Sequence, residues 1–148
     1  MNSFLDFFKQ HGLAVGEAAP SLTAKDQQGQ IVELGELYRR SAVFIYFYVR
    51  AGTPLCTAHA CRLRDRFAEL RARGIEILGV SADPPERLAQ FQTRKQIPFR
   101  LLADTDGAIA RGFRVPSFLG MTARDAYLIR DGRVVWKGRA GQGVPDGV

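Results

Sequence analysis

The uncharged run from Ala42 to Val49 constrains the fold of this chain more than any other stretch. It is rich in aromatic and β-branched side chains, a composition typical of a buried strand. A short segment over 50–54, which contains Gly52 and Pro54, follows the run and ends the strand. An Ala-, Arg-, Leu- and Glu-rich segment follows and predicts a helix over 54–73, which Gly74 ends. A buried strand that leads directly into a helix is typical of an α/β fold.

The rest of the chain repeats this alternation. Strands are predicted at 74–82 and 99–103, each followed by a helix, the first with Asp83 as its N-cap. Strands that alternate with helices at this spacing favour βαβ units and a largely parallel sheet. Later in the chain, Asp131 and Gly132 separate two strand-like runs and predict an antiparallel hairpin. Two short extended pieces around a turn at 26–29 and a helical turn at 35–40 precede the central strand.

Both cysteines of the protein, Cys56 and Cys61, fall in the first turns of the predicted helix. Unpaired N–H groups at a helix N-terminus favour an anion, so this placement favours the thiolate, which is the reactive form. Five helical steps separate the cysteines by about 140° around the axis and roughly 7.5 Å along it. A disulfide needs Cα atoms about 4.4–6.8 Å apart. An intact helix therefore cannot join these thiols, and a bond between them requires the first turn to unwind.

The segment around these cysteines resembles the active-site segment of peroxiredoxins. Within that family it is similar to the Q-type group, also called bacterioferritin comigratory proteins. The family motif is Pro-x-x-x-Thr-x-x-Cys with a second cysteine after four intervening residues, and Thr53, Cys56 and Cys61 match it. Val49 stands at the position of the motif proline, where it keeps an apolar wall but restores an N–H donor. Arg124 precedes a Tyr-Leu-Ile run, as the family's active-site arginine does, and the resemblance covers roughly residues 15–137.

The resemblance implies a thioredoxin-like α/β fold, with a central mixed β-sheet flanked by helices. We expect one domain over 1–148, with residues 139–148 as a flexible tail. The implied activity is that of a thiol peroxidase that reduces hydrogen peroxide and organic hydroperoxides. In it, Cys56 attacks the peroxide and becomes a sulfenic acid, which Cys61 resolves as an intramolecular disulfide. Thioredoxin or a similar dithiol reductant then restores both thiols.

The resemblance also implies the other parts of the site. Thr53 is the expected hydroxyl donor to the peroxide, and Arg124 is the expected cation beside the developing charge. No cofactor and no metal are expected, and the protein is expected to be a monomer or a weak homodimer. Tyr48 is a further candidate for the wall of the thiol pocket, while the other aromatic residues of the central strand are expected in the core.

Simpler interpretations exist for each of these residues. The cysteines can be small buried hydrophobes, Thr53 a capping residue and Arg124 an ordinary surface residue. The spacing of Cys56, His59 and Cys61 is compatible with a metal site, although consecutive helical positions point these side chains apart. His59 is instead expected to be exposed near the thiol. Rival functions are a disulfide oxidoreductase, against which the four intervening residues argue, and a non-enzymatic redox sensor.

The composition of the whole chain limits these choices. With 148 residues, of which 46% are hydrophobic, the chain can build one core. Its net charge of +6 arises from basic residues interleaved with acidic ones, which argues against a nucleic-acid partner. No apolar run approaches the ~20 residues of a membrane-spanning helix. Residues 1–10 carry Asp6 within their apolar part, which favours a short amphipathic helix over a signal peptide. We therefore expect a cytoplasmic protein, in which a thiol pair is more often catalytic than structural.

Overall fold

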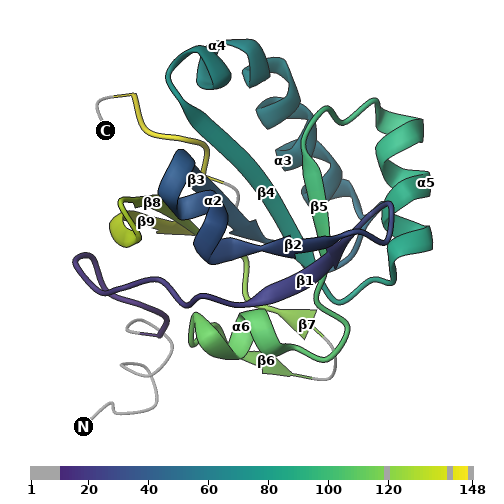
Figure 1. The fold of residues 1–148 in the computed structure, drawn as a ribbon. Helices are drawn as coiled ribbons and strands as arrows, with labels where there is room; N and C mark the ends of the chain where they lie inside the picture. The colour runs from purple at the N-terminus through teal and green to yellow at the C-terminus, as the bar shows by residue number, and fades with distance from the viewer. Residues whose placement is uncertain (1–10, 119–120, 140–141, 147–148) are drawn as a thin grey trace, which may run out of the picture.

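A computed structural model of the chain describes residues 11–118, 121–139 and 142–146 and contains a mixed seven-stranded sheet with helices on both faces (Figure 1). The strand order is β2-β1-β5-β4-β3-β8-β9. Strands β3, β4 and β5 are parallel, whereas β1, β2, β8 and β9 join the sheet by antiparallel pairing. The predicted mixed sheet, with parallel units first and an antiparallel hairpin late, is confirmed.

The elements lie close to the ranges that the sequence predicts. The strands of the large sheet are β1 (Thr23–Asp26), β2 (Ile31–Glu33), β3 (Ala42–Phe47), β4 (Ile75–Ser81), β5 (Arg100–Ala103), β8 (Asp125–Arg130) and β9 (Arg133–Arg139). The helices are α2 (Leu34–Arg40), α3 (Pro54–Asp65), α4 (Phe67–Ala72), α5 (Pro85–Lys95) and α6 (Ala108–Gly112). Strands β6 (Ser117–Phe118) and β7 (Met121–Thr122) form a separate pair. Within these described ranges, no helix has the length and apolar character needed to cross a membrane.

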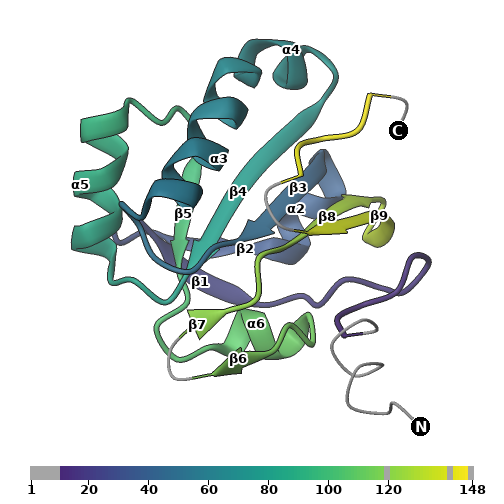
Figure 2. The same cartoon turned by 180° about the vertical axis from the view of Figure 1, so that it is seen from behind.

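Strand β3 divides the core into two layers because its side chains alternate between the faces of the sheet. Val43, Ile45 and Phe47 pack with residues of α2 and α6. Phe44 and Tyr46 pack on the other face with residues of α3, α4 and α5. Figure 2 shows these three helices over one face of the sheet. All five side chains are buried, which confirms the prediction that this run is a core strand.

The predicted single helix over 54–73 is wrong, because it is two helices that meet at Arg66. The backbone of Arg66 has φ −100° and ψ 4°, and its N–H donates to the carbonyl of Leu63, three residues back. Its guanidinium donates to the carbonyl of Val144 at 2.7 Å and to Glu69. The break thus coincides with a contact to a segment 78 residues away, which local sequence patterns do not encode.

The predicted N-cap of α5 is also wrong. Pro84 is the N-cap of this helix, and no side-chain capping bond is present. The carboxylate of Asp83 instead accepts the N–H of Ala51 at 2.7 Å and the hydroxyl of Ser81 at 2.9 Å. Asp83 therefore fixes the loop between β3 and α3, the loop that leads into the cysteines.

The late hairpin has the geometry that its sequence predicts. Asp131 and Gly132 connect β8 and β9 with φ values of 54° and 76°. Positive φ at both central residues is the requirement of a type I′ turn, which Asp-Gly satisfies readily. The helix expected at the N-terminus falls in residues 1–10, outside the described ranges.

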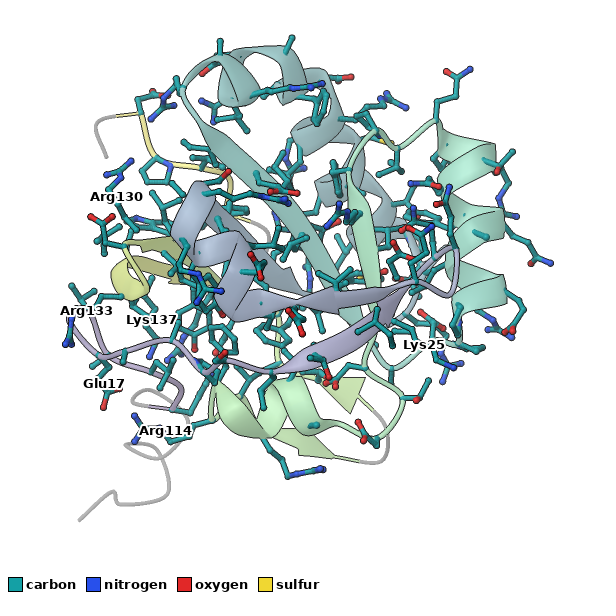
Figure 3. The ribbon with its side chains drawn as sticks, viewed as in Figure 1. Glu17, Lys25, Arg114, Arg130, Arg133 and Lys137 are labelled. Atoms are coloured by element: carbon teal, nitrogen blue, oxygen red, sulfur yellow. The ribbon has the colours of Figure 1, made fainter. Side chains whose placement is uncertain are left out.

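Part of the positive charge of the chain fastens its N-terminal segment to the sheet. Figure 3 shows Glu17, Arg114, Arg133 and Lys137 on one side of the molecule, beside the first described residues. Arg114 forms an ion pair with Glu17, and Arg133 donates to the carbonyl of Gly16 at 3.0 Å. Arg114 and Arg133 are therefore engaged within the fold.

The tail predicted as flexible coil over 139–148 has neither helix nor strand over 142–146. This part lies against α3 and α4, where Val144 is only 3% exposed and belongs to the same core layer as Cys56. The flexibility of the tail stays a prediction, but its described residues have specific contacts on the helices.

Candidate active site

Cys56 lies in the first turn of α3, with its side chain turned toward the sheet. It is 4% exposed and packs in the core layer of α3, α4 and α5. Cys61 is half-buried, and both thiols are free. Because α3 runs without interruption over Pro54–Asp65, the two thiols point to different sides of the helix. The helix between the two cysteines is therefore intact, and its first turn would have to unwind before Cys56 and Cys61 could form a disulfide.

Arg124 reaches the start of α3 from the far end of the sequence. Strand β8 runs antiparallel to β3 with Tyr46 opposite Ala126, so the residue before β8 lies where β3 ends. The Arg124 Nη2 donates to the carbonyl of Leu55 at 3.4 Å, next to Cys56. Its Nε is buried and has no hydrogen-bond partner among the described residues. The arginine and the cysteine that the sequence singles out are therefore brought together.

Tyr48 supplies a second unpartnered polar atom beside the thiol. Its side chain is buried in the core layer that contains Cys56, and its hydroxyl makes no hydrogen bond within the described part of the chain. Burial raises the pKa of the Tyr48 phenol, so the group stays protonated and can donate. Buried polar atoms without partners are rare, and an unoccupied ligand position is one explanation for them.

Thr53 is the N-cap of α3, but its side chain does not cap the helix. Its hydroxyl donates to the carbonyl of Arg50 at 3.0 Å. The proton of the hydroxyl is thus used within the loop, while its oxygen can still accept a hydrogen bond. The N–H groups of the first turn are not capped by this side chain and keep their preference for an anion.

The loop before α3 is held from the neighbouring strand. Because β4 lies parallel to β3, the residues after both strands meet at the same end of the sheet. Asp83, just beyond β4, accepts the N–H of Ala51 there. Val49, at the position of the motif proline, is half-buried and packs against the core layer of Cys56. Parallel pairing of consecutive strands is the signal from which sequence reasoning could have placed Asp83 in this loop.

His59 is buried, which corrects the expectation that it is exposed. It is 3% exposed, and its ring packs against Tyr46 with the ring centroids 4.7 Å apart. Burial, together with the charges of Arg124 and Arg62, lowers its pKa to about 4, so it is neutral at pH 7. Its Nε2 lies 3.2 Å from the carbonyl oxygen of Gln142. Since a carbonyl only accepts, this nitrogen carries the hydrogen.

The metal alternative finds no support in the geometry. Within 11–118, 121–139 and 142–146, no group of three or more histidine, cysteine or acidic side chains is arranged to hold a metal ion.

Residues 15–137 match the model of the AhpC/TSA family. The chain belongs to this family. The putative peroxiredoxin bcp of Haemophilus influenzae is 44% identical over 113 residues, which cover 74% of this chain and 72% of that protein. The peroxiredoxin Bcp of Escherichia coli K12 is 38% identical over 130 residues, which cover 82% and 83%.

Solved structures of peroxiredoxins have the same fold. Peroxidoxin BcpB from Mycobacterium tuberculosis superposes with a TM-score of 0.82 at 28% identity and covers 86% of each chain. A bacterioferritin comigratory protein of Xanthomonas campestris has a TM-score of 0.75 at 25% identity and covers 84% of this chain and 88% of its own. These matches confirm the predicted family, the thioredoxin-like fold and the class of activity. The protein is a thiol peroxidase.

Removing the carboxylate of Asp83 should slow the reduction of peroxide by the protein. In Asp83→Ala the loop N–H of Ala51 loses its acceptor, and displacement of the loop should lower the second-order rate constant by about 10–100-fold. The lost bonds should also lower the free energy of unfolding by about 1–3 kcal/mol. Stopped-flow thiol titration and urea unfolding measure the two effects. Glu86→Ala, at an exposed position nearby, is the control, and a wild-type rate in Asp83→Ala would contradict the role of this clamp.

His59 should make the stability of the protein sensitive to acid. Its pKa is 6.5 in the unfolded chain and about 4 in the folded one, so the unfolded state binds more protons between these values. The free energy of unfolding therefore falls as the pH drops from 6.5 toward 4, by on the order of 2 kcal/mol at pH 4.5. His59→Gln lacks this proton equilibrium. Urea unfolding at pH 7 and 4.5 should show the smaller acid loss in the variant, and equal losses would reject the buried neutral histidine.

Proposed function

We propose that Cys56 is the peroxidatic thiol, that Cys61 resolves its oxidised form, and that Arg124 and Thr53 assist the first step. The Cys56 thiolate attacks one oxygen of the hydroperoxide and the O–O bond breaks. The sulfur is oxidised to a sulfenic acid, and the other oxygen leaves as water or an alcohol after taking up a proton. The first step thus needs a stabilised sulfur anion and a site for the negative charge that develops on the leaving oxygen.

The start of α3 and Arg124 meet these two needs. The helix N-terminus favours a negative sulfur, and the guanidinium lies against the carbonyl of the residue before Cys56. A fixed positive group in a site largely closed to water stabilises developing negative charge more than it would in solvent. Tyr48 can donate to one of the peroxide oxygens through its free hydroxyl hydrogen. The oxygen of Thr53 can accept a hydrogen bond from the peroxide O–H, since its own proton is donated to the carbonyl of Arg50.

One observation carries the proposal: of the buried polar atoms without a hydrogen-bond partner among the described residues, Arg124 Nε and Tyr48 Oη belong to side chains beside the first turn of α3. A hydroperoxide bound at Cys56 would offer its oxygens to both of them. A merely structural cysteine in a core layer would leave these donors unexplained.

The second half of the reaction forms the intramolecular disulfide. The Cys61 thiol attacks the sulfur of the Cys56 sulfenic acid, an S–S bond forms and water leaves. Thioredoxin or a similar dithiol reductant then reduces the disulfide by exchange. The Xanthomonas campestris neighbour is described by its alkyl peroxide reduction activity. We extend this substrate class to the present chain, beside hydrogen peroxide, and propose a monomer or weak homodimer as the working form.

An assay coupled to thioredoxin and thioredoxin reductase tests these roles. Cys56→Ser should abolish peroxide consumption, and Arg124→Gln should lower kcat/KM by about 10²–10³-fold. The matched control is Arg111→Gln, an exposed arginine of α6, which should retain wild-type activity. Retained peroxide consumption in Cys56→Ser would reject the assignment of the thiol.

Peptide mapping of the oxidised protein tests the resolving step. Wild type treated with one equivalent of peroxide should yield a peptide that links Cys56 to Cys61. A covalent dimer joined through Cys61 would instead reject the intramolecular route.

A further inference from the structure

The described part of the C-terminal tail, Gln142–Asp146, follows one face of helices α3 and α4, and we refer to it as the strap. In Figures 1 and 2 this yellow segment runs from β9 toward α4 along the sheet face that these helices cover. Three side chains from α3, from its junction with α4 and from the end of α4 donate to carbonyls of the strap. They are His59 to Gln142 at 3.2 Å, Arg66 to Val144 at 2.7 Å, and Arg73 to Pro145 at 3.3 Å.

His59 lies within α3, Arg66 at the junction of α3 and α4, and Arg73 at the C-terminal end of α4, so the strap contacts both helices. Val144 is buried between the donor contacts, in the core layer that holds Cys56. The strap therefore has specific contacts with the middle of α3 and with both ends of α4.

His59 is the strap contact that lies between the two thiols in the described part of the chain. It follows Cys56 by three residues and precedes Cys61 by two. Its ring is fixed on one side by Tyr46 and at Nε2 by the strap carbonyl, and it is neutral at pH 7 because burial and nearby arginines lower its pKa to about 4. Nothing in the first half of the reaction uses this donor, since it is engaged with the strap.

The second half of the reaction requires the turn that His59 occupies to change. In α3 the two cysteines lie roughly 7.5 Å apart along the helix axis alone, whereas a disulfide needs Cα atoms within about 6.8 Å. A hydrogen bond from the middle of this turn to a fixed strap stabilises the helical form against the opened one. Its loss should favour opening.

We propose that His59 is a positioning residue for the resolving step, and that its bond to the strap slows disulfide formation by holding the turn between the thiols helical. The proposal rests on the roles given above to Cys56 and Cys61. It adds a function for the strap, which determines how long the sulfenic acid persists.

The persistence of the sulfenic acid decides between two outcomes. In one, the Cys61 thiol attacks the sulfenic sulfur, the disulfide forms and water leaves. In the other, a second hydroperoxide oxidises the sulfenic acid to a sulfinic acid and leaves as water or an alcohol. A stronger hydrogen bond between His59 and the strap slows the first outcome and so favours the second. The ratio of disulfide to sulfinic acid therefore reports on the hydrogen bond between His59 and the strap. A purely structural role for His59 would leave this ratio unchanged.

Two substitutions at His59 separate the hydrogen bond from the packing. His59→Leu fills the buried space but has no donor, and His59→Gln retains an N–H that can reach the strap carbonyl. After one equivalent of hydrogen peroxide, His59→Leu should form the disulfide about tenfold faster than wild type. It should also need about tenfold more peroxide for half-maximal sulfinic acid, while His59→Gln stays close to wild type in both measurements. An unchanged or slower disulfide step in His59→Leu would overturn the proposal.

The single tryptophan of the chain gives a direct signal for the strap. A Cβ placed on Gly138 would lie 2.3 Å from the Trp136 ring and 2.7 Å from the Gln142 side chain, so both approach the same point of β9. Stopped-flow fluorescence should therefore show a phase with the rate of disulfide formation, which quenched mass spectrometry measures independently. A disulfide that forms without this phase would contradict release of the strap.

A second pair of variants tests the strap contacts without altering any residue between Cys56 and Cys61. Arg66→Gln weakens the next strap contact and should also speed disulfide formation. Arg64→Gln is the matched control, because Arg64 donates to the carbonyl of Lys95 on the α5 side of the helix. It should leave the disulfide rate unchanged, and equal acceleration by both would show that the strap has no particular role.

The same traces separate this inference from the proposed function. If hydrogen peroxide fails to oxidise Cys56 rapidly in wild type, the proposed function itself fails. If that first phase is fast in every variant but the disulfide phase is the same in wild type and His59→Leu, only the role of His59 is rejected.

Discussion

The junction between β3 and α3 is held in one place by contacts from distant parts of the chain, and each proposed role depends on it. Asp83 holds the loop from the end of β4, and Arg124 reaches the first turn from the start of β8. The strap contacts the middle of α3 through His59. Because these contacts come from different segments, the catalytic turn is fixed only in the complete fold.

A buried thiol needs such a junction in order to work as an anion. Burial penalises any charged group, and at 4% exposure the sulfur of Cys56 cannot depend on water. The helix N-terminus and the guanidinium of Arg124 can compensate for that loss, since both are fixed before the substrate arrives. Val49 packs against the core layer that contains Cys56 and Tyr48, and Arg124 contacts the residue before Cys56.

Local patterns predict most of the sheet and the position of both cysteines near the start of a helix. Strand alternation, Asp-Gly turns and helix starts are encoded by neighbouring residues. The strand–loop–helix unit around Cys56 and the hairpin at Asp131 agree with the structure for this reason. Interactions between distant segments are not encoded in this way. Asp83 suits a helix cap but is engaged by the loop before α3, and the helix breaks at Arg66, where its side chain meets the strap. The burial of His59 likewise follows from a segment 83 residues away.

The rate at which Cys56 reacts with hydrogen peroxide tests whether this junction activates the thiol. The measurement is best made on Cys61→Ser, so that only one cysteine is present, by rapid mixing at pH 7 with free cysteine as the reference. A thiolate held by the helix N-terminus and Arg124 should react at least about 10³-fold faster than free cysteine. A rate within about tenfold of free cysteine would mean that the surroundings of Cys56 do not activate it, and would contradict the proposed roles.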